Sequence, residues 1–247
     1  MQIKQGQIIG LSEHRLAVGD CRDPYLIEKL LGGETIDLLL TDPPYSCGYV
    51  EGKAGFSQIS KDKVIANDEE KTEEQYREFS SQWLTALVPH LANKNTFYIF
   101  QSDRMVFALK KSLDDNDFKL AQLLVWIKNQ PVMNRLDYLG QHESIAYGWR
   151  GSHKFRKSKD KTVLFYPRPS CSRLHPTMKP VGLLRRLILN SSKIGDIVFD
   201  GFLGSGSTLL ASEQTKRRCF GVELDIEYCQ TIIDRWEKLT GQKARVL

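Results

Sequence analysis

Short apolar runs recur along the chain between segments of helical periodicity. Each run is bounded by polar or turn-forming residues, a pattern that favours strands buried on both faces of a sheet. The runs are Ile36–Leu40, Thr96–Phe100, Leu120–Ile127, Ser144–Tyr147, Ile197–Phe199 and Arg218–Val222.

The segments between these strands carry apolar residues at helical spacing. Residues 72–75 (Thr-Glu-Glu-Gln) have the form of a capping box and predict the start of a helix with Tyr76, Phe79 and Trp83 on its apolar face. Further helices are predicted over Pro24–Leu31, Arg104–Leu113, Pro180–Ser191, Ser207–Thr215 and Ile226–Leu239. Because strands alternate with helices, we expect the α/β class, a single doubly wound, mostly parallel sheet with helices on both faces.

Two stretches interrupt this alternation. Ser46–Asp68 is rich in Gly, Ser and Lys, and a basic stretch runs from Arg150 to Leu174. Loops of this length inside a domain are usually functional or mobile. Both follow predicted strands, so we expect a mobile loop (46–68) and a basic insert (150–174) at the sheet edge where ligands bind.

The length of 247 residues suits one domain spanning 1–247. The chain lacks an apolar run of about 18 residues and an apolar leader, so neither a transmembrane helix nor a signal peptide is expected. Its five cysteines are scattered without a C-x-x-C pair, which indicates reduced thiols and a cytoplasmic location. Cys171 and His175 are two of the four ligands that a zinc site needs, so no metal is expected.

The positive charge is concentrated in one stretch. The whole chain has a net charge of +5, whereas residues 150–173 hold eight basic residues against one acidic residue, +7, which leaves −2 for the rest. Such clustering is typical of a surface that binds a polyanion, although a solvated basic loop has the same composition.

A candidate catalytic motif follows the first predicted strand. Asp42, Pro43, Pro44 and Tyr45 form a rigid turn, because neither proline can continue a strand ladder. The turn holds a carboxylate, a main-chain carbonyl and an aromatic ring close together. An amino group on a purine needs two acceptors in its plane and a face to stack on, which these groups can supply. A plain strand-ending turn uses the same residue types.

A glycine-rich segment follows the strand predicted at Ile197–Phe199. Gly204 and Gly206 allow a tight turn with close backbone approach to a ligand, and Ser207 or Thr208 can begin the next helix. Glu223 ends the following strand, 19 residues beyond Gly204, and can accept hydrogen bonds from both ribose hydroxyls of an adenosine. A nicotinamide cofactor could use the same features, although position 209 is Leu where that fingerprint has its third glycine.

Asp42–Tyr45 resembles the catalytic motif of amino-group DNA methyltransferases, whose Asp-initial form is typical of adenine-N6 enzymes and whose Ser-initial form is typical of cytosine-N4 enzymes. The resemblance covers nearly the whole chain, in the motif order of the β group, where the catalytic motif precedes the cofactor loop. It implies a circularly permuted S-adenosylmethionine-dependent methyltransferase fold, in which Arg15–Gly19 completes the sheet beside the ribose-binding strand and the termini lie near one another.

Two more segments resemble family motifs. His175–Pro180 resembles the motif before the cofactor loop, where Lys179 beside a helix start can hold the methionine carboxylate of the cofactor. In Gly19-Asp20-Cys21 the acidic residue is expected at the cofactor's adenine amino group. Gly201 departs from the family, where Pro is common. The resemblance implies cofactor contacts from Asp20, Cys21, Asp42, Thr177, Lys179, Asp200, Phe202, Gly204, Ser205, Gly206, Ser207, Thr208, Glu223 and Leu224.

Segments 126–129, 135–138 and 142–143 also resemble parts of the family. We expect them to shape the target pocket and assign them no catalytic role; an ordinary strand and loop explain them equally well.

The resemblance implies a DNA adenine-N6 methyltransferase that uses S-adenosylmethionine. The adenine is flipped out of double-stranded DNA and stacked on Tyr45, its amino group donates to Asp42 and the Pro43 carbonyl, and the methyl group is transferred directly. Phosphate contacts are expected from Arg150, Lys154, Arg156, Lys157, Lys159, Arg168 and Arg173. The basic insert is short, which predicts a short recognition sequence. A partner restriction endonuclease and a homodimer are compatible with this interpretation.

Several alternatives stay open. Cytosine N4, an RNA base or a protein amide could be the methyl acceptor, although motif order disfavours the amide. A nicotinamide-dependent oxidoreductase would use Gly204–Gly206 and Glu223 but leaves Asp42–Tyr45 unexplained. A non-catalytic DNA-binding module would explain the basic stretch alone.

Overall fold

One ten-stranded sheet runs through the computed structural model, which describes residues 2–45, 71–131, 137–153, 155–156, 159–168 and 178–247. The strands are β1 Ile8–Leu11, β2 His14–Val18, β3 Ile36–Thr41, β4 Leu91–Gln101, β5 Phe118–Ile127, β6 His142–Arg150, β7 Val163–Phe165, β8 Ile197–Asp200, β9 Arg218–Glu223 and β10 Arg245–Val246. Their spatial order is β10-β1-β2-β9-β8-β3-β4-β6-β5-β7.

The middle of the sheet is parallel. Strands β2, β9, β8, β3 and β4 run in the same direction, so their carboxyl ends share one edge, called here the carboxyl edge. Strand β6 is antiparallel to both β4 and β5, and β1 is antiparallel to β2. Ligands bind at the carboxyl edge of open α/β sheets, so the site should lie there.

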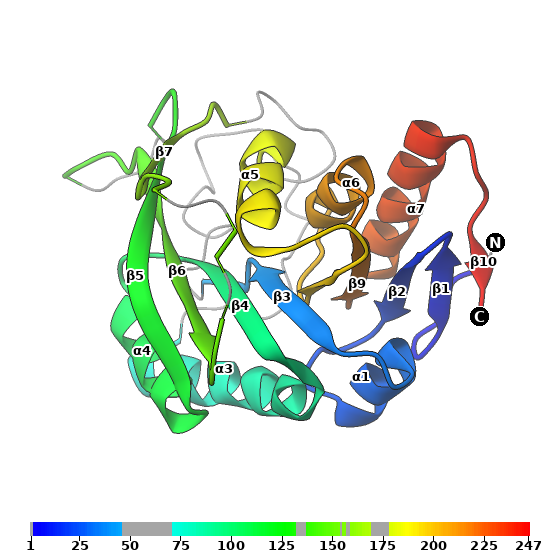
Figure 1. Cartoon of the computed structure of the whole chain (residues 1–247), viewed down its shortest axis with the longest axis horizontal. Coiled ribbons are helices and arrows are strands. Elements are labelled where there is room, and N and C mark those ends of the chain that lie inside the picture. Colours follow the sequence, from blue (N-terminus) through cyan, green and yellow to red (C-terminus); the bar gives the residue numbers. More distant parts are fainter. Residues whose placement is uncertain (1, 46–70, 132–136, 154, 157–158, 169–177) are drawn as a thin grey trace.

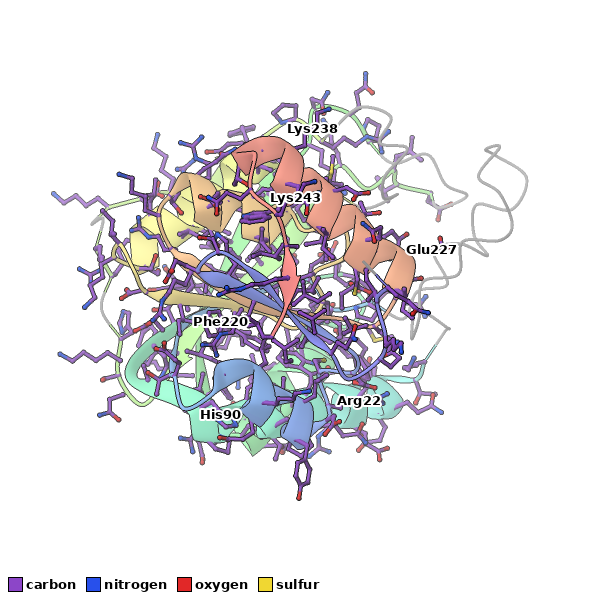
Figure 2. All side chains as sticks on the ribbon, turned by 90° about the vertical axis from the view of Figure 1, so that its right-hand side faces the viewer. Arg22, His90, Phe220, Glu227, Lys238 and Lys243 are labelled. Carbon is purple, nitrogen blue, oxygen red and sulfur yellow. The ribbon has the colours of Figure 1, made fainter. Side chains whose placement is uncertain are left out.

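Helices cover both faces of the sheet (Figure 1). Helices α5, α6 and α7 lie on one face and α1, α3 and α4 on the other. Their bounds are α1 Pro24–Leu31, α3 Glu73–Leu87, α4 Val106–Asp115, α5 Val181–Ser191, α6 Ser207–Gln214 and α7 Ile226–Thr240, with a short 3-10 helix at Val88–His90. Figure 2 looks along the sheet from the β10–β1 end and shows α7 above the strands and α1 below, with Phe220 between the two layers.

Local sequence explains where the helices begin and end. The Thr72 hydroxyl accepts from the Gln75 N–H and the Gln75 side chain accepts from the Thr72 N–H, which is the predicted capping box at α3. The Asp225 carboxylate caps α7 by accepting from the Glu227 and Tyr228 N–H groups, and Gly241, in the left-handed region, ends the helix. Apolar faces of these helices then pack on the sheet, where Trp83 and Trp236 are fully buried.

The predicted fold class is confirmed. Every predicted strand and helix is present, and Arg15–Val18 pairs parallel with Phe220–Glu223, so the N-terminal strand completes the sheet as expected. The Leu247 N–H donates to the Ile8 carbonyl oxygen, and both chain ends lie at one edge of the sheet (Figure 1). These features fit the circular permutation.

Three strands were not predicted: β1, β7 and β10. Strand β7 lies inside the stretch that was expected to be a basic loop, and β10 is only two residues long. Strand β4 begins at Leu91, before its predicted start at Thr96, because the polar segment there pairs with the start of β3. The loop predicted at 46–68 lies outside the described residues.

The basic stretch 150–174 was expected at the carboxyl edge, and for its first residue, Arg150, this expectation was wrong. Strand β6 is antiparallel, so Arg150 at its carboxyl end lies at the edge opposite the carboxyl edge, paired with Phe118 at the start of β5. Its guanidinium donates to the Asn116 carbonyl oxygen at 3.0 Å. The Arg156 N–H donates to the carbonyl of Asn190, near the end of α5, so Arg156 lies toward that edge too.

Among the described residues, no helix combines the length and the apolar character needed to cross a membrane.

Candidate active site

The two motifs predicted from the sequence meet at the carboxyl edge. Strands β3 and β8 are parallel neighbours, so Asp42 after β3 lies beside the turn that begins at Asp200. The Thr41 hydroxyl donates to Asp200 Oδ1 at 2.8 Å and accepts from the Gly201 N–H at 3.2 Å. The proline-rich strand end (residues 42–45) and the glycine turn (residues 200–206) therefore form one continuous site.

Both oxygens of the Asp42 carboxylate have partners. The Tyr45 hydroxyl donates to Oδ1 at 2.6 Å, and the Lys179 ammonium donates to Oδ2 at 2.5 Å. Lys179 comes just before α5 and is 7% exposed at its side chain. Its ammonium also lies 5.4 Å from the centre of the Tyr45 ring. An amino group that binds Asp42 must share or replace one of these donors.

A second carboxylate lies in the same pocket. Glu143, near the start of β6, accepts from the Tyr45 hydroxyl at 3.1 Å and pairs with Lys179 at 3.2 Å. Lys128, directly after β5, pairs with its other oxygen at 2.8 Å. Glu143 and Lys128 lie in segments 142–143 and 126–129, which were expected to shape the target pocket without a catalytic role. Their position as charged residues at the ends of apolar strands was the sequence feature that could have indicated a role in the site.

The buried charges shift one another's pKa. Burial raises the pKa of Asp42 and Glu143 raises it further, against the opposing charge of Lys179. Burial acts the same way on Glu143, but the ammonium groups of Lys179 and Lys128 bring its pKa below the ordinary value. Burial disfavours the charge of Lys179, yet the two carboxylates raise its pKa. Lys179 therefore stays protonated between two acidic groups.

The glycine turn approaches helix α7 closely. Gly204 and Gly206 have φ of 51° and 80°, in the left-handed region that favours glycine. A Cβ on Gly206 would lie 3.0 Å from Ile232 of α7. Helix α6 begins here without a side-chain cap, and the buried Ser207 hydroxyl has no partner among the described residues. A helix start with uncapped N–H groups fits a polar ligand on this turn.

Glu223 ends β9 beside the turn. Its Oε2 accepts from the Gly204 N–H at 2.7 Å and its Oε1 from the Asp225 N–H at 2.8 Å. Burial raises its pKa to about 7, although these two N–H groups favour the charged form. The carboxylate is thus fixed by backbone donors at the position expected to bind a ribose, and it keeps lone pairs for two hydroxyl groups.

Asp200 and Phe202 shape the base of the turn. Asp200 accepts from Thr41 and from the Phe202 N–H, and burial raises its pKa to about 6. The Phe202 ring packs edge-on against Trp83 of α3, 5.8 Å between ring centres. These contacts anchor the turn to β3 and α3. Together with the glycine geometry, they fit an adenosine-containing cofactor.

The remaining predicted cofactor residues are spread around this turn. Asp20 is bound by the Arg22 guanidinium through both carboxylate oxygens, Cys21 is buried against Gly201, and the Leu224 carbonyl accepts from Gln5. Ser205, Ser207 and Thr208 are buried at the start of α6. Thr177 lies outside the described residues, as do Lys154, Lys157 and Arg173.

One half-buried arginine near the turn was not predicted. Arg235 of α7 donates from its guanidinium to the Ser205 carbonyl oxygen. It lies one turn after Ile232, on the face of α7 that packs against the glycine turn. An arginine on the apolar face of an amphipathic helix was the signal that could have revealed it.

Known proteins resemble this chain over most of its length. The type II methyltransferase M2.MboI of Moraxella bovis is 26% identical over 227 residues, covering 83% of this chain and 82% of the relative. M.HpaI of Haemophilus parainfluenzae is 27% identical, covering 87% and 72%. Among solved structures, the cytosine-N4-specific PvuII DNA methyltransferase superposes with a TM-score of 0.71 at 18% identity, covering 93% of this chain and 91% of that chain. The M1.HpyAVI–SAM complex does so with a TM-score of 0.65 at 23% identity, covering 89% and 98%.

A sequence model described as DNA methylase matches residues 36–170 and 148–234, which together span far more than half of the chain. The matched region includes the strand-end carboxylate, the glycine turn and Glu223. The chain belongs to the N6/N4 DNA methylase family.

Proposed function

We propose that this protein methylates the N6 amino group of adenine in double-stranded DNA, with S-adenosylmethionine as the methyl donor. The observation that carries the proposal is the position of Asp42 at the end of β3, directly beside the glycine turn after β8 and linked to it through the Thr41–Asp200 hydrogen bond. Asp42 can accept a hydrogen bond from a target amine while the neighbouring glycine turn holds a methyl donor.

The cofactor half of the site comprises the glycine turn, Glu223 and the groups that brace them. S-adenosylmethionine supplies a methyl group bonded to a positively charged sulfur, which makes that group reactive toward a neutral amine. Glu223 would accept from the ribose hydroxyls, and Gly204 and Gly206 allow close approach of the backbone. Phe202 supplies an apolar wall held by Trp83.

The target half comprises Asp42, Pro43 and Tyr45. Asp42 would accept a hydrogen bond from the target amino group, and the Pro43 carbonyl would accept the second. This orients the nitrogen lone pair toward the glycine turn, so catalysis is mainly positioning and electrostatics. The Tyr45 hydroxyl now donates to Oδ1 of Asp42. If this hydrogen bond breaks, Oδ1 becomes available as an acceptor and the Tyr45 ring becomes available for stacking.

DNA would approach the carboxyl edge. Flipping the base is required because the amino group of a paired adenine is not accessible to a buried carboxylate. The Arg168 N–H donates to Asn129 just beyond β5, so its exposed side chain lies at this edge and is proposed to contact a phosphate. Arg150 and Arg156, near the opposite edge, are left out of the proposed contact surface.

Cytosine N4 is the second candidate target. The structural likeness to the cytosine-N4-specific PvuII enzyme favours it. The Asp at position 42 favours adenine, because the cytosine-N4 motif typically begins with Ser. Incubation with labelled cofactor and double-stranded DNA, followed by digestion to nucleosides, distinguishes N6-methyl-2′-deoxyadenosine from N4-methyl-2′-deoxycytidine. Label only in the cytosine product would overturn the proposal, and label in neither would overturn methyl transfer to DNA.

The variant Asp42→Asn tests the role of the carboxylate. We expect methyl transfer to fall by about 10³-fold, because the amide removes the charged acceptor, whereas cofactor affinity stays close to normal. Single-turnover transfer and calorimetric titration of the cofactor measure the two effects. Asp103→Asn, an exposed acid beside β6, is the matched control and should transfer normally. Near-normal transfer by Asp42→Asn would refute the assignment.

A further inference from the structure

Four charged side chains form an unbroken row in the target pocket. From one end, Lys128 Nζ lies 2.8 Å from Glu143 Oε1, Glu143 Oε2 lies 3.2 Å from Lys179 Nζ, and Lys179 Nζ lies 2.5 Å from Asp42 Oδ2. The charges alternate, two positive and two negative, so the row is neutral as a whole. Each member comes from a different strand or helix end.

The row is buried among aromatic rings. The exposed fractions of the four side chains are 8%, 18%, 7% and 24% in the same order. The Lys128 ammonium lies 5.4 Å from the centre of the Trp126 ring, and the Lys179 ammonium 5.0 Å from that of Phe100. Charges in such surroundings are costly unless they are paired, so removing one member changes the balance of the others.

Glu143 is the centre of this row. It contacts both lysines and also the Tyr45 hydroxyl, which in turn donates to Asp42. Through Lys179 and through Tyr45 it therefore reaches both oxygens of the Asp42 carboxylate. Lys128 pairs with Oε1 of Glu143, whereas Lys179 and the Tyr45 hydroxyl contact Oε2.

We propose that Glu143 and Lys128 are positioning residues that set the charge and the orientation of Asp42, the carboxylate that accepts the target amino group. Glu143 holds Lys179 and Tyr45 in place, and Lys128 balances the charge that Glu143 brings into the pocket. This inference rests on the proposed function, because it gives Asp42 the role assigned there.

The two residues should act on Asp42 in opposite directions. Removing the negative charge of Glu143 leaves Lys179 to Asp42 alone, which favours the ionised carboxylate and lowers its pKa. Removing the positive charge of Lys128 leaves Glu143 unbalanced, which disfavours a second negative charge and raises the pKa of Asp42. Among the described residues, Tyr45 and Asp200 also interact with Asp42, and both residues are present in every variant.

The test compares Glu143→Gln, Lys128→Met and the double variant. The ionisation of Asp42 is followed in the cofactor-free protein by carbon-13 NMR of the aspartate carboxyl groups, with Asp42→Asn to assign the signal. We expect the midpoint to move down by about one pH unit in Glu143→Gln and up by about one unit in Lys128→Met. The acid limb of the pH profile of kcat should move the same way.

The double variant separates a charge effect from damage to the fold. It removes one charge of each sign, so the Asp42 midpoint should return close to the wild-type value. A purely structural role predicts that the double variant is at least as impaired as either single variant and that no midpoint moves. Asp234→Asn, an exposed acid on α7 outside the row, should leave the midpoint unchanged.

Two results would overturn the inference: equal midpoints in all variants, or shifts of the same sign in the two single variants. The NMR measurement needs neither DNA nor methyl transfer. A protein that shows the opposite shifts but methylates no adenine would therefore refute the proposed function while keeping this charge arrangement.

Discussion

At the scale of single residues, the site is built from acidic side chains that already accept hydrogen bonds from other groups of the protein. Asp42 is bound by Tyr45 and Lys179, and Glu223 by two backbone N–H groups. Prior engagement fixes the direction of each carboxylate before a ligand arrives, so less ordering is needed on binding. A target amino group would have to share or replace one of the two donors that hold Asp42.

We predict that Glu223 makes cofactor binding sensitive to pH near neutrality. Its pKa is raised to about 7 by burial, so the ionised form, the better acceptor for ribose hydroxyls, increases as pH passes through this value. We expect the Kd for S-adenosylmethionine to fall several-fold, about tenfold at most, between about pH 6 and pH 8. Calorimetric titration of the cofactor across this range measures it.

The variant Glu223→Gln should bind the cofactor weakly at every pH and lose this dependence. Glu227→Gln changes an exposed acid at the start of α7 and gives the same net charge as Glu223→Gln. This control should behave like the wild type. A pH dependence that persists in Glu223→Gln would assign the effect to another group.

At the scale of elements, α7 supports the cofactor turn. Ile232 packs where a Cβ on Gly206 would lie, and Arg235, one turn later, donates to the Ser205 carbonyl oxygen. Inside the turn, the Gly206 N–H donates to the Leu203 carbonyl oxygen, whereas the Ser205 carbonyl oxygen accepts from a group outside it. A donor from a neighbouring helix therefore stabilises its conformation.

Arg235→Met should weaken cofactor binding without affecting the chemistry. A hydrogen bond from a charged donor contributes about 1.5–3 kcal/mol, so we expect the KM for S-adenosylmethionine to rise about tenfold or more. The kcat at saturating cofactor should change little, because Asp42 and its partners are untouched. Initial rates over a range of cofactor concentrations separate the two constants.

Lys238→Met is the matched control on the same helix. Lys238 is exposed near the carboxyl end of α7 (Figure 2) and should leave the KM unchanged. An equal KM in Arg235→Met and the wild type would show that the turn holds its shape without this donor.

At the scale of the whole molecule, the two ends of the sheet's strands present different groups. The carboxyl edge holds Asp42, the glycine turn and Glu223, and the opposite edge holds Arg150. Net charge alone does not distinguish them, because basic residues from one stretch of sequence are distributed between the two. Arg168 lies at the first edge and Arg150 at the second.

Salt dependence of DNA binding should follow this division. Replacing Arg168 with Gln removes one proposed phosphate contact, so the slope of log K against log salt should become less steep by about 0.9. Replacing Arg150 with Gln removes the same charge at the opposite edge and should leave the slope unchanged. Fluorescence anisotropy with a labelled duplex at several salt concentrations measures both. The reverse ranking would place the DNA at the other edge.

Local pattern was sufficient for most of the fold and for the two central motifs. A short apolar run such as Ile36–Leu40, followed by two prolines, favours a buried strand, and the capping box at Thr72 marks a helix start, because these preferences act within a few residues. Parallel order then brings strand ends to one edge, which is why Asp42 and Gly204 could be expected in one site.

Long-range pairing decided the rest. The direction of β6 puts Arg150 far from the site, and no local periodicity encodes whether a strand runs parallel or antiparallel to its neighbour. The row from Lys128 to Asp42 joins residues from separate strand and helix ends. These residues are far apart along the chain and come into contact only in the folded protein. Charges buried together depend on distance in space, so only the tertiary structure could show that Glu143 belongs to the target pocket.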